Sequence, residues 1–112
     1  MTKKVLRSPA PYTVGHKFKA KPQTLDGIHF ASKKEMNHYL NLQKLQELGK
    51  IVFFLRQAPF HLPGGIKYVC DFMVFWANGT VTFEEVKGFK TEMYKAKKKL
   101  VEHYYPLEII EV

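Results

Sequence analysis

Along the chain, the first regular pattern of apolar and polar positions has the period of an α-helix. Apolar residues recur at helical spacing from Met36 to Leu48, and Ser32 followed by Glu35 has the form of a capping box. Gly49 then ends the pattern. The spacing predicts a helix over about 33–48.

Three extended segments follow this helix. They are predicted at 51–57, 66–76 and 80–87. The first is β-branched and aromatic, and we expect Pro59 to end it, with 60–62 extending the strand after a break. Turn residues at 63–65 and at Asn78-Gly79 separate the three segments, so the pattern predicts an antiparallel meander.

A second helix is predicted from a cap at Thr91 to about Tyr105, and Pro106 breaks it before a last strand at 107–112. The apolar stripe expected to face the core consists of Met93, Ala96, Leu100 and Tyr104. The order α-β-β-β-α-β predicts an α/β (α+β) domain over 26–112. Residues 1–25 are basic and contain three prolines, so we interpret them as an N-terminal arm, with a solvated tail as the alternative.

Composition narrows the classes of function. The 112 residues are enough for one domain, and 18 Lys and Arg against 10 acids give a net charge of +8, which favours a polyanionic partner such as nucleic acid. No apolar run is long enough to span a bilayer or to form a signal peptide, so we expect no membrane partner and a cytoplasmic location. Cys70 is the only cysteine, which excludes an internal disulfide and a cysteine-based zinc site.

Two acids and a lysine stand out within the apolar strands. Glu85 and Lys87 share one face of their strand, because side chains alternate, whereas Glu84 faces the other way. A two-residue loop at Asn78-Gly79 would put Asp71 on the wrong face. A three-residue loop with Gly79 in the left-handed conformation would bring Asp71 opposite Glu85, and chemistry at this site requires that register or an equivalent bulge.

Two neighbouring carboxylates repel each other unless a cation or a proton lies between them. Mg²⁺ or Mn²⁺ would resolve that conflict, and an adjacent lysine favours an anionic substrate such as a phosphodiester.

Asp71 followed by Glu85-Val86-Lys87, with Glu35 on the preceding helix, resembles the PD-(D/E)XK nuclease superfamily, and in particular its small phage-encoded members. The resemblance covers about 25–112 and implies a restriction-endonuclease-like core with a central mixed sheet flanked by helices. Cys70 stands where the superfamily motif has proline.

The resemblance also implies roles for these residues. Asp71, Glu85 and the backbone carbonyl of Val86 would bind the metal, with Glu35 as a further candidate, and Lys87 would orient water or stabilise negative charge. A buried structural ion pair is the alternative for the acids and the lysine, and a helix-capping role is the alternative for Glu35.

Residues expected to contact DNA lie on the arm and on the two helices. They are Lys17, Lys19, Lys21, Lys33, Lys34, Lys90, Tyr94, Lys95 and Lys98. A solvated charged face is the alternative for them. Gln57, near the end of the first strand, is expected either to reach the site or to make an edge hydrogen bond.

The sequence therefore predicts a Mg²⁺- or Mn²⁺-dependent endodeoxyribonuclease, specific for DNA structure rather than sequence and resembling a Holliday-junction resolvase. We expect it to act in phage recombination or DNA processing as a homodimer on branched DNA. One alternative is a catalytically inactive DNA-binding accessory protein of the same fold. An RNA-directed function has no supporting signature.

Overall fold

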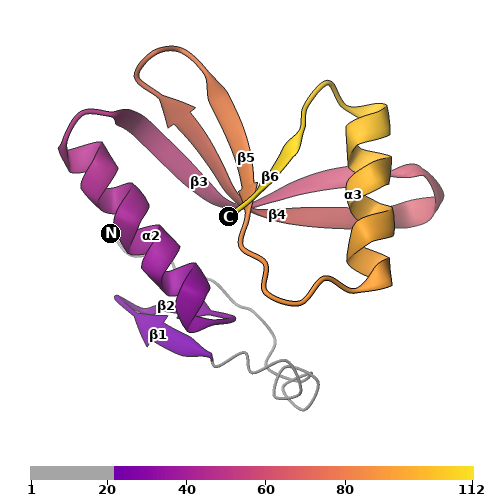
Figure 1. The fold of residues 1–112 in the computed structure, drawn as a ribbon, viewed down its shortest axis with the longest axis horizontal. Helices are drawn as coiled ribbons and strands as arrows, with labels where there is room; N and C mark the ends of the chain where they lie inside the picture. The colour runs from indigo at the N-terminus through magenta and orange to yellow at the C-terminus, as the bar shows by residue number, and fades with distance from the viewer. Residues whose placement is uncertain (1–21) are drawn as a thin grey trace. The chain divides into compact units, whose positions relative to one another are not determined.

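The computed structural model describes residues 22–112, which form two compact units that divide after Asn41. In chain order the elements are β1 (Gln23–Leu25), β2 (Ile28–Phe30), α2 (Lys33–Glu47), β3 (Ile51–Leu62), the short 3-10 turn η1 (Pro63–Gly65), β4 (Ile66–Trp76), β5 (Val81–Glu85), α3 (Glu92–Tyr104) and β6 (Ile109–Glu111) (Figure 1). None of the helices in this part of the chain is long and apolar enough to cross a membrane.

The N-terminal unit contains a β-hairpin that the sequence analysis did not predict. Strands β1 and β2 pair antiparallel, with Leu25 opposite Ile28. The turn between them, Asp26-Gly27, has positive φ at both positions, 52° and 77°, as a tight two-residue hairpin requires. The predicted arm therefore extends too far along the chain, because β1 occupies its last residues, while residues 1–21 lie outside the described part.

Helix α2 begins as predicted. The Ser32 hydroxyl accepts a hydrogen bond from the Glu35 backbone N–H at 3.1 Å, which satisfies one of the unpaired donors of the first turn. Glu35, Tyr39 and Leu42 are buried at a spacing of four and three residues, so they share one face. Leu40 and Leu48, which belonged to the predicted apolar pattern, are exposed.

The C-terminal unit is built on a four-stranded mixed sheet in the order β3-β4-β5-β6. The first three strands form the predicted antiparallel meander, and β6 runs parallel to β5. The parallel pairing follows from the connection, because α3 carries the chain back before β6 begins. The predicted α+β class is confirmed, and so is the predicted order of elements from α2 to β6.

The break expected at Pro59 does not occur. Strand β3 is continuous from Ile51 to Leu62, and Pro59 pairs with Val69 in the same register as its neighbours. The sheet order places β3 at an edge, where it bonds to β4 alone. Proline is tolerated there because its missing N–H can point away from the neighbouring strand.

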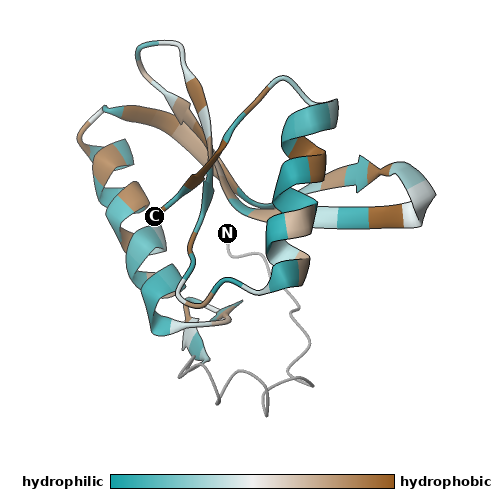
Figure 2. Cartoon of the chain, turned by 45° about the vertical axis from the view of Figure 1, so that its right-hand side comes forward, coloured by the Kyte–Doolittle hydropathy of each residue, from teal (hydrophilic) through white to brown (hydrophobic). Residues whose placement is uncertain are grey.

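Helix α3 packs against β3 and β4 (Figure 1) through a face that matches the predicted one only in part, since Leu100 of the predicted stripe packs against the core. Its buried residues are Tyr94 and Val101, whereas Met93 and Tyr104 of the predicted stripe are exposed. The cluster under this helix consists of Leu62, Tyr68, Cys70, Tyr94, Val101 and Ile109. Figure 2 shows the mixture of hydrophilic and hydrophobic positions on α3 that made the stripe ambiguous.

Candidate active site

The turn between β4 and β5 has the three-residue geometry that the site requires. The Trp76 N–H donates to the Thr80 carbonyl at 2.8 Å, the Gly79 N–H donates to the Trp76 carbonyl at 2.9 Å, and Gly79 has a φ of +94°. Phe72 therefore pairs with Glu84. The same register places Asp71 opposite Glu85, so the predicted register is confirmed.

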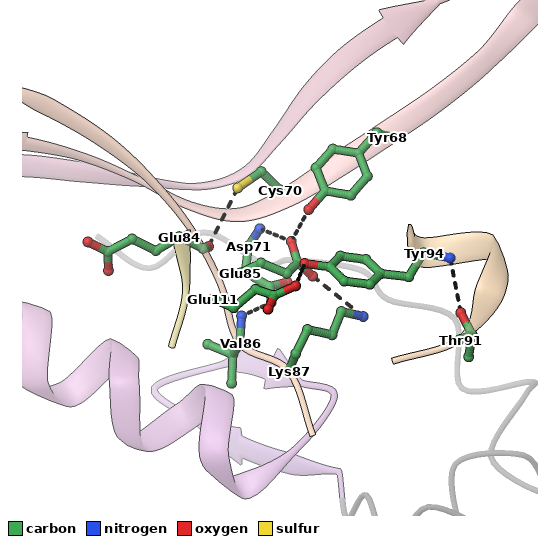
Figure 3. A network of polar contacts seen from close by, with 10 residues as sticks. All are labelled: Tyr68, Cys70, Asp71, Glu84, Glu85, Val86, Lys87, Thr91, Tyr94 and Glu111. Atoms are coloured by element: carbon green, nitrogen blue, oxygen red, sulfur yellow. Dashed lines mark hydrogen bonds and ion pairs between the residues drawn. The ribbon is translucent and has the colours of Figure 1, made fainter. Parts of the chain in front are cut away.

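Asp71 and Glu85 are held together by backbone hydrogen bonds (Figure 3). The Val86 N–H donates to Asp71 Oδ2 at 3.0 Å, and the Asp71 N–H donates to Glu85 Oε1 at 3.3 Å. Glu85 thus accepts from the backbone of Asp71, and Asp71 accepts from the backbone of the residue after Glu85, which fixes both side chains. Both residues are buried, with 6% and 5% of their surface exposed.

Tyr68 supplies a further hydrogen bond to the same oxygen. Its hydroxyl donates to Glu85 Oε1 at 2.6 Å. Burial, the nearby Glu85 charge and this hydrogen bond raise the pKa of Tyr68 well above its ordinary value, so the phenol stays protonated and remains a donor.

Lys87 lies beside the second oxygen of Glu85. Its Nζ is 3.7 Å from Glu85 Oε2 and 4.3 Å from the centre of the Tyr94 ring. An ammonium over an aromatic face is attracted by the ring quadrupole. The side chain keeps 25% of its surface exposed, so its charge is fixed in place but still reaches solvent.

Tyr94 is in turn anchored to β6. Its hydroxyl donates to Glu111 Oε2 at 2.8 Å, and Lys90 Nζ lies 2.8 Å from Glu111 Oε1. Burial and the hydrogen bond to Glu111 raise the pKa of Tyr94, whereas the hydrogen bonds from Lys90 and Tyr94 lower the pKa of Glu111. The result is a chain of contacts from Lys90 through Glu111 and Tyr94 to Lys87.

Glu84 points away from this cluster, as predicted (Figure 3). Its Oε2 accepts from the Thr82 hydroxyl at 2.8 Å, and the Trp76 indole N–H donates to Thr82 Oγ1 at 2.8 Å. Thr82 and Trp76 lie on the same face of β4 and β5 as Glu84.

Cys70 directly precedes Asp71 on β4. Its thiol is buried and lies 3.5 Å from the Glu84 carbonyl and 3.6 Å from the Phe72 carbonyl. Burial raises the pKa of the Cys70 thiol to about 12, so it stays protonated and unreactive. The thiol packs in the core beneath α3, as expected from its strand position.

Residues 22–112 contain no group of three or more His, Cys, Asp or Glu side chains that could hold a metal ion. The predicted set has two such side chains, Asp71 and Glu85, with the Val86 carbonyl as a third oxygen. Hard oxygen donors of this kind suit Mg²⁺ and Mn²⁺. A carboxylate offers about four lone-pair positions, so the three contacts made by Glu85 leave capacity for a cation. The donor set fits a hard divalent ion.

The structure does not test whether Glu35 belongs to this set. Glu35 lies in the N-terminal unit, where it is buried and takes part in the helix start. Its assignment to the metal site stays a prediction.

The predicted DNA contacts differ in their surroundings. Lys17, Lys19 and Lys21 lie outside the described residues, while Lys33 and Lys34 are exposed on the first turn of α2. On and near α3, three lysines are each paired with an acid: Lys90 with Glu111, Lys95 with Glu92, and Lys98 with Glu102. Tyr94 was wrongly placed on the exposed face, because it is buried with 6% exposure and supports Lys87 instead.

Sequence reasoning missed Tyr68 and Glu111. Tyr68 lies three residues before Asp71, where simple strand alternation predicts the opposite face. Glu111 pairs with Glu85 across the parallel strands. The sequence showed only that Glu111 lies in the last strand. Its pairing partner could not be predicted, because no short turn fixes the register of a strand that returns after a helix.

The chain belongs to the family described as "Protein of unknown function (DUF1064)", whose model matches residues 15–110. No curated protein and no solved structure matches the chain.

Proposed function

We propose that this member of the family is a metal-dependent endodeoxyribonuclease of the PD-(D/E)XK type. The observation that carries the proposal is the pairing of Asp71 with Glu85 across β4 and β5, with the Lys87 ammonium 3.7 Å from Glu85. Two buried carboxylates at adjacent positions with an amine beside them are a costly arrangement for stability alone. They are suited to holding a cation next to a phosphodiester.

Asp71, Glu85 and the Val86 carbonyl would hold Mg²⁺ or Mn²⁺. When bound, such an ion supplies Lewis-acid stabilisation of phosphate charge and eases ionisation of the attacking water. Lys87 would stabilise negative charge that develops on the phosphate, and the Tyr94 ring and Glu85 keep its ammonium in position. Tyr68 would orient the Glu85 carboxylate through its 2.6 Å hydrogen bond.

We propose branched or otherwise irregular DNA as the substrate. The net charge of +8 supports binding to the phosphate backbone, which positions a protein without reading sequence. A homodimer would let two sites cut two strands, as junction resolution requires. The proposed setting is phage recombination in the cytoplasm of a bacterial host.

A DNA-binding accessory protein without turnover is the second candidate. The observation in its favour is that both oxygens of Glu85 already have partners within the protein, Tyr68 and the Asp71 N–H on one and Lys87 on the other. A purely structural ion pair would have the same contacts.

Cleavage assays separate these candidates. Wild type, Asp71→Ala, Lys87→Ala and the matched control Glu84→Gln would each be incubated with supercoiled plasmid and with a four-way junction, in Mg²⁺, Mn²⁺ or EDTA. We expect metal-dependent cutting by wild type and by Glu84→Gln, and binding without cutting by Asp71→Ala. Binding without cutting by every protein in both metals would favour the accessory role, and equal cutting by all four would show that the site is misplaced.

A further inference from the structure

Gln57 has a backbone conformation that its residue type does not favour. It lies inside the continuous strand β3 yet has a φ of +57°, in the left-handed region. The other described non-glycine residue with positive φ, Asp26, lies in a hairpin turn where this conformation is required. Left-handed residues within a strand are held by their surroundings and cluster at functional sites.

The register of the sheet places Gln57 directly across from Asp71. Its neighbours Arg56 and Ala58 pair with Phe72 and Cys70, so position 57 falls opposite position 71. Paired positions on antiparallel strands have Cα atoms about 5 Å apart. Gln57, Asp71 and Glu85 therefore occupy one line across β3, β4 and β5.

The side-chain amide nitrogen of Gln57 is buried and has no hydrogen-bond partner within the described residues. An amide NH₂ group donates two hydrogen bonds, and leaving such a donor buried and unpaired is costly. An unsatisfied group of this kind in a strained residue leaves a donor available to a partner outside the described residues.

The chemistry of the position selects the kind of partner. A neutral donor at a strand position paired with an acid can bind an anionic oxygen without forming an ion pair with that acid, which an Arg or Lys would do. A non-bridging oxygen of a phosphodiester is an acceptor of this kind.

We infer that Gln57 is a substrate-contacting residue whose side-chain amide donates a hydrogen bond to a non-bridging oxygen of the phosphodiester presented to Asp71 and Glu85. The inference rests on the proposed nuclease function and adds a residue on a third strand to the site.

The test uses substitutions that separate the side chain from the backbone. Glycine adopts a positive φ without strain, so Gln57→Gly should keep or raise the melting temperature while removing the donor. Gln57→Asn tolerates the same backbone but carries a shorter amide. Gln46→Ala, at an exposed position on α2, is the matched loss of a glutamine.

We expect Gln57→Gly and Gln57→Asn to reduce the single-turnover cleavage rate of a four-way junction by about 10- to 100-fold, the range of a hydrogen bond to a charged group, and Gln46→Ala to leave it unchanged. Binding would be measured by fluorescence anisotropy with Ca²⁺ on junctions carrying a single methylphosphonate at the position that wild type cuts. On unmodified junctions we expect wild type to bind more tightly than Gln57→Gly. With one of the two methylphosphonate stereoisomers this difference in affinity should disappear, because the oxygen that Gln57 contacts is gone.

The outcomes distinguish the two proposals. A wild-type protein that cuts neither junction nor plasmid would overturn both. Cleavage by wild type with full activity in folded Gln57→Gly and Gln57→Asn would overturn the role of Gln57 alone. A reduced rate in both variants whose binding deficit persists with both methylphosphonate stereoisomers would assign Gln57 a structural role instead.

Discussion

Glu84 and Glu85 are consecutive residues of β5 with nearly the same exposure, 6% and 5%, yet they lie in different chemical settings. The Glu84 carboxylate accepts from the neutral Thr82 hydroxyl, which is itself bonded to Trp76. The Glu85 carboxylate lies across from a second acid and beside an ammonium. Strand alternation alone separates the two settings.

The contrast teaches that burial of an acid does not identify a site. What distinguishes Glu85 is a neighbour of like charge, since two carboxylates at paired strand positions repel unless a cation, a proton or an ammonium compensates them. Lys87 compensates one carboxylate from the side. A divalent ion between Asp71 and Glu85 would compensate both.

The largest expected effect comes from neutralising each glutamate in turn. Glu85→Gln should lower the single-turnover cleavage rate by at least about 100-fold. Mutating a residue that hydrogen-bonds to a metal ligand typically lowers activity by about 10- to 100-fold, and losing the ligand itself should cost no less. Glu84→Gln should stay within about 3-fold of wild type. Both rates would be measured on the same junction with saturating Mg²⁺.

Equal losses in the two variants would remove the distinction between the two faces of β5. Circular dichroism and thermal denaturation of both proteins would show that any loss is not due to unfolding.

A smaller effect should follow from removing one hydroxyl on each face. Tyr68→Phe deletes the donor to Glu85 and should lower the cleavage rate by about 10-fold, with a cost in unfolding free energy of about 1–2 kcal/mol. Thr82→Val deletes the group between Trp76 and Glu84 and should lower stability by about 1–3 kcal/mol without slowing a folded enzyme.

Urea denaturation and single-turnover kinetics on the same preparations would measure both quantities. The comparison breaks if Thr82→Val slows cleavage as much as Tyr68→Phe does.

The smallest effect concerns pH and the anchor of Tyr94. Hydrogen bonds from Lys90 and Tyr94 lower the pKa of Glu111 in the folded protein. A lowered folded pKa gives stability that is present above the unfolded pKa, about 4.5, and is lost as the pH falls through the folded value. The melting temperature of wild type should therefore exceed that of Glu111→Gln by a constant margin from about pH 8 to pH 5, and the margin should shrink below about pH 4.5.

Melting curves across this range would measure the margin. A difference that grows as the pH falls would show that Glu111 is not held as an ionised partner.

The parts of the fold that depend on local signals could be predicted from the sequence. Asn78-Gly79 located the turn and left two registers for the strands, and the requirement that Asp71 and Glu85 share a face selected the one that the structure has. Thr91 was correctly predicted as the cap of α3, where its hydroxyl accepts from the Tyr94 N–H at 3.0 Å.

The parts that depend on tertiary packing could not be predicted in the same way. The apolar residues of α3 fit two stripes, and the sheet selected the one with Tyr94 and Val101 rather than Met93 and Tyr104. Pro59 was expected to end β3 because the sequence does not reveal which strand lies at an edge. The pairing of Glu111 with Glu85 depends on the path of α3 between the two strands.

Direct measurement of Mn²⁺ binding tests the central claim without relying on a substrate. Electron paramagnetic resonance of free Mn²⁺ would be followed during titration with wild type, Asp71→Asn, Glu85→Gln and Glu84→Gln. We predict that wild type and Glu84→Gln deplete the free-ion signal and that Asp71→Asn and Glu85→Gln do not. Equal depletion by all four proteins, or none by wild type, would contradict the claim that Asp71 and Glu85 hold a divalent cation.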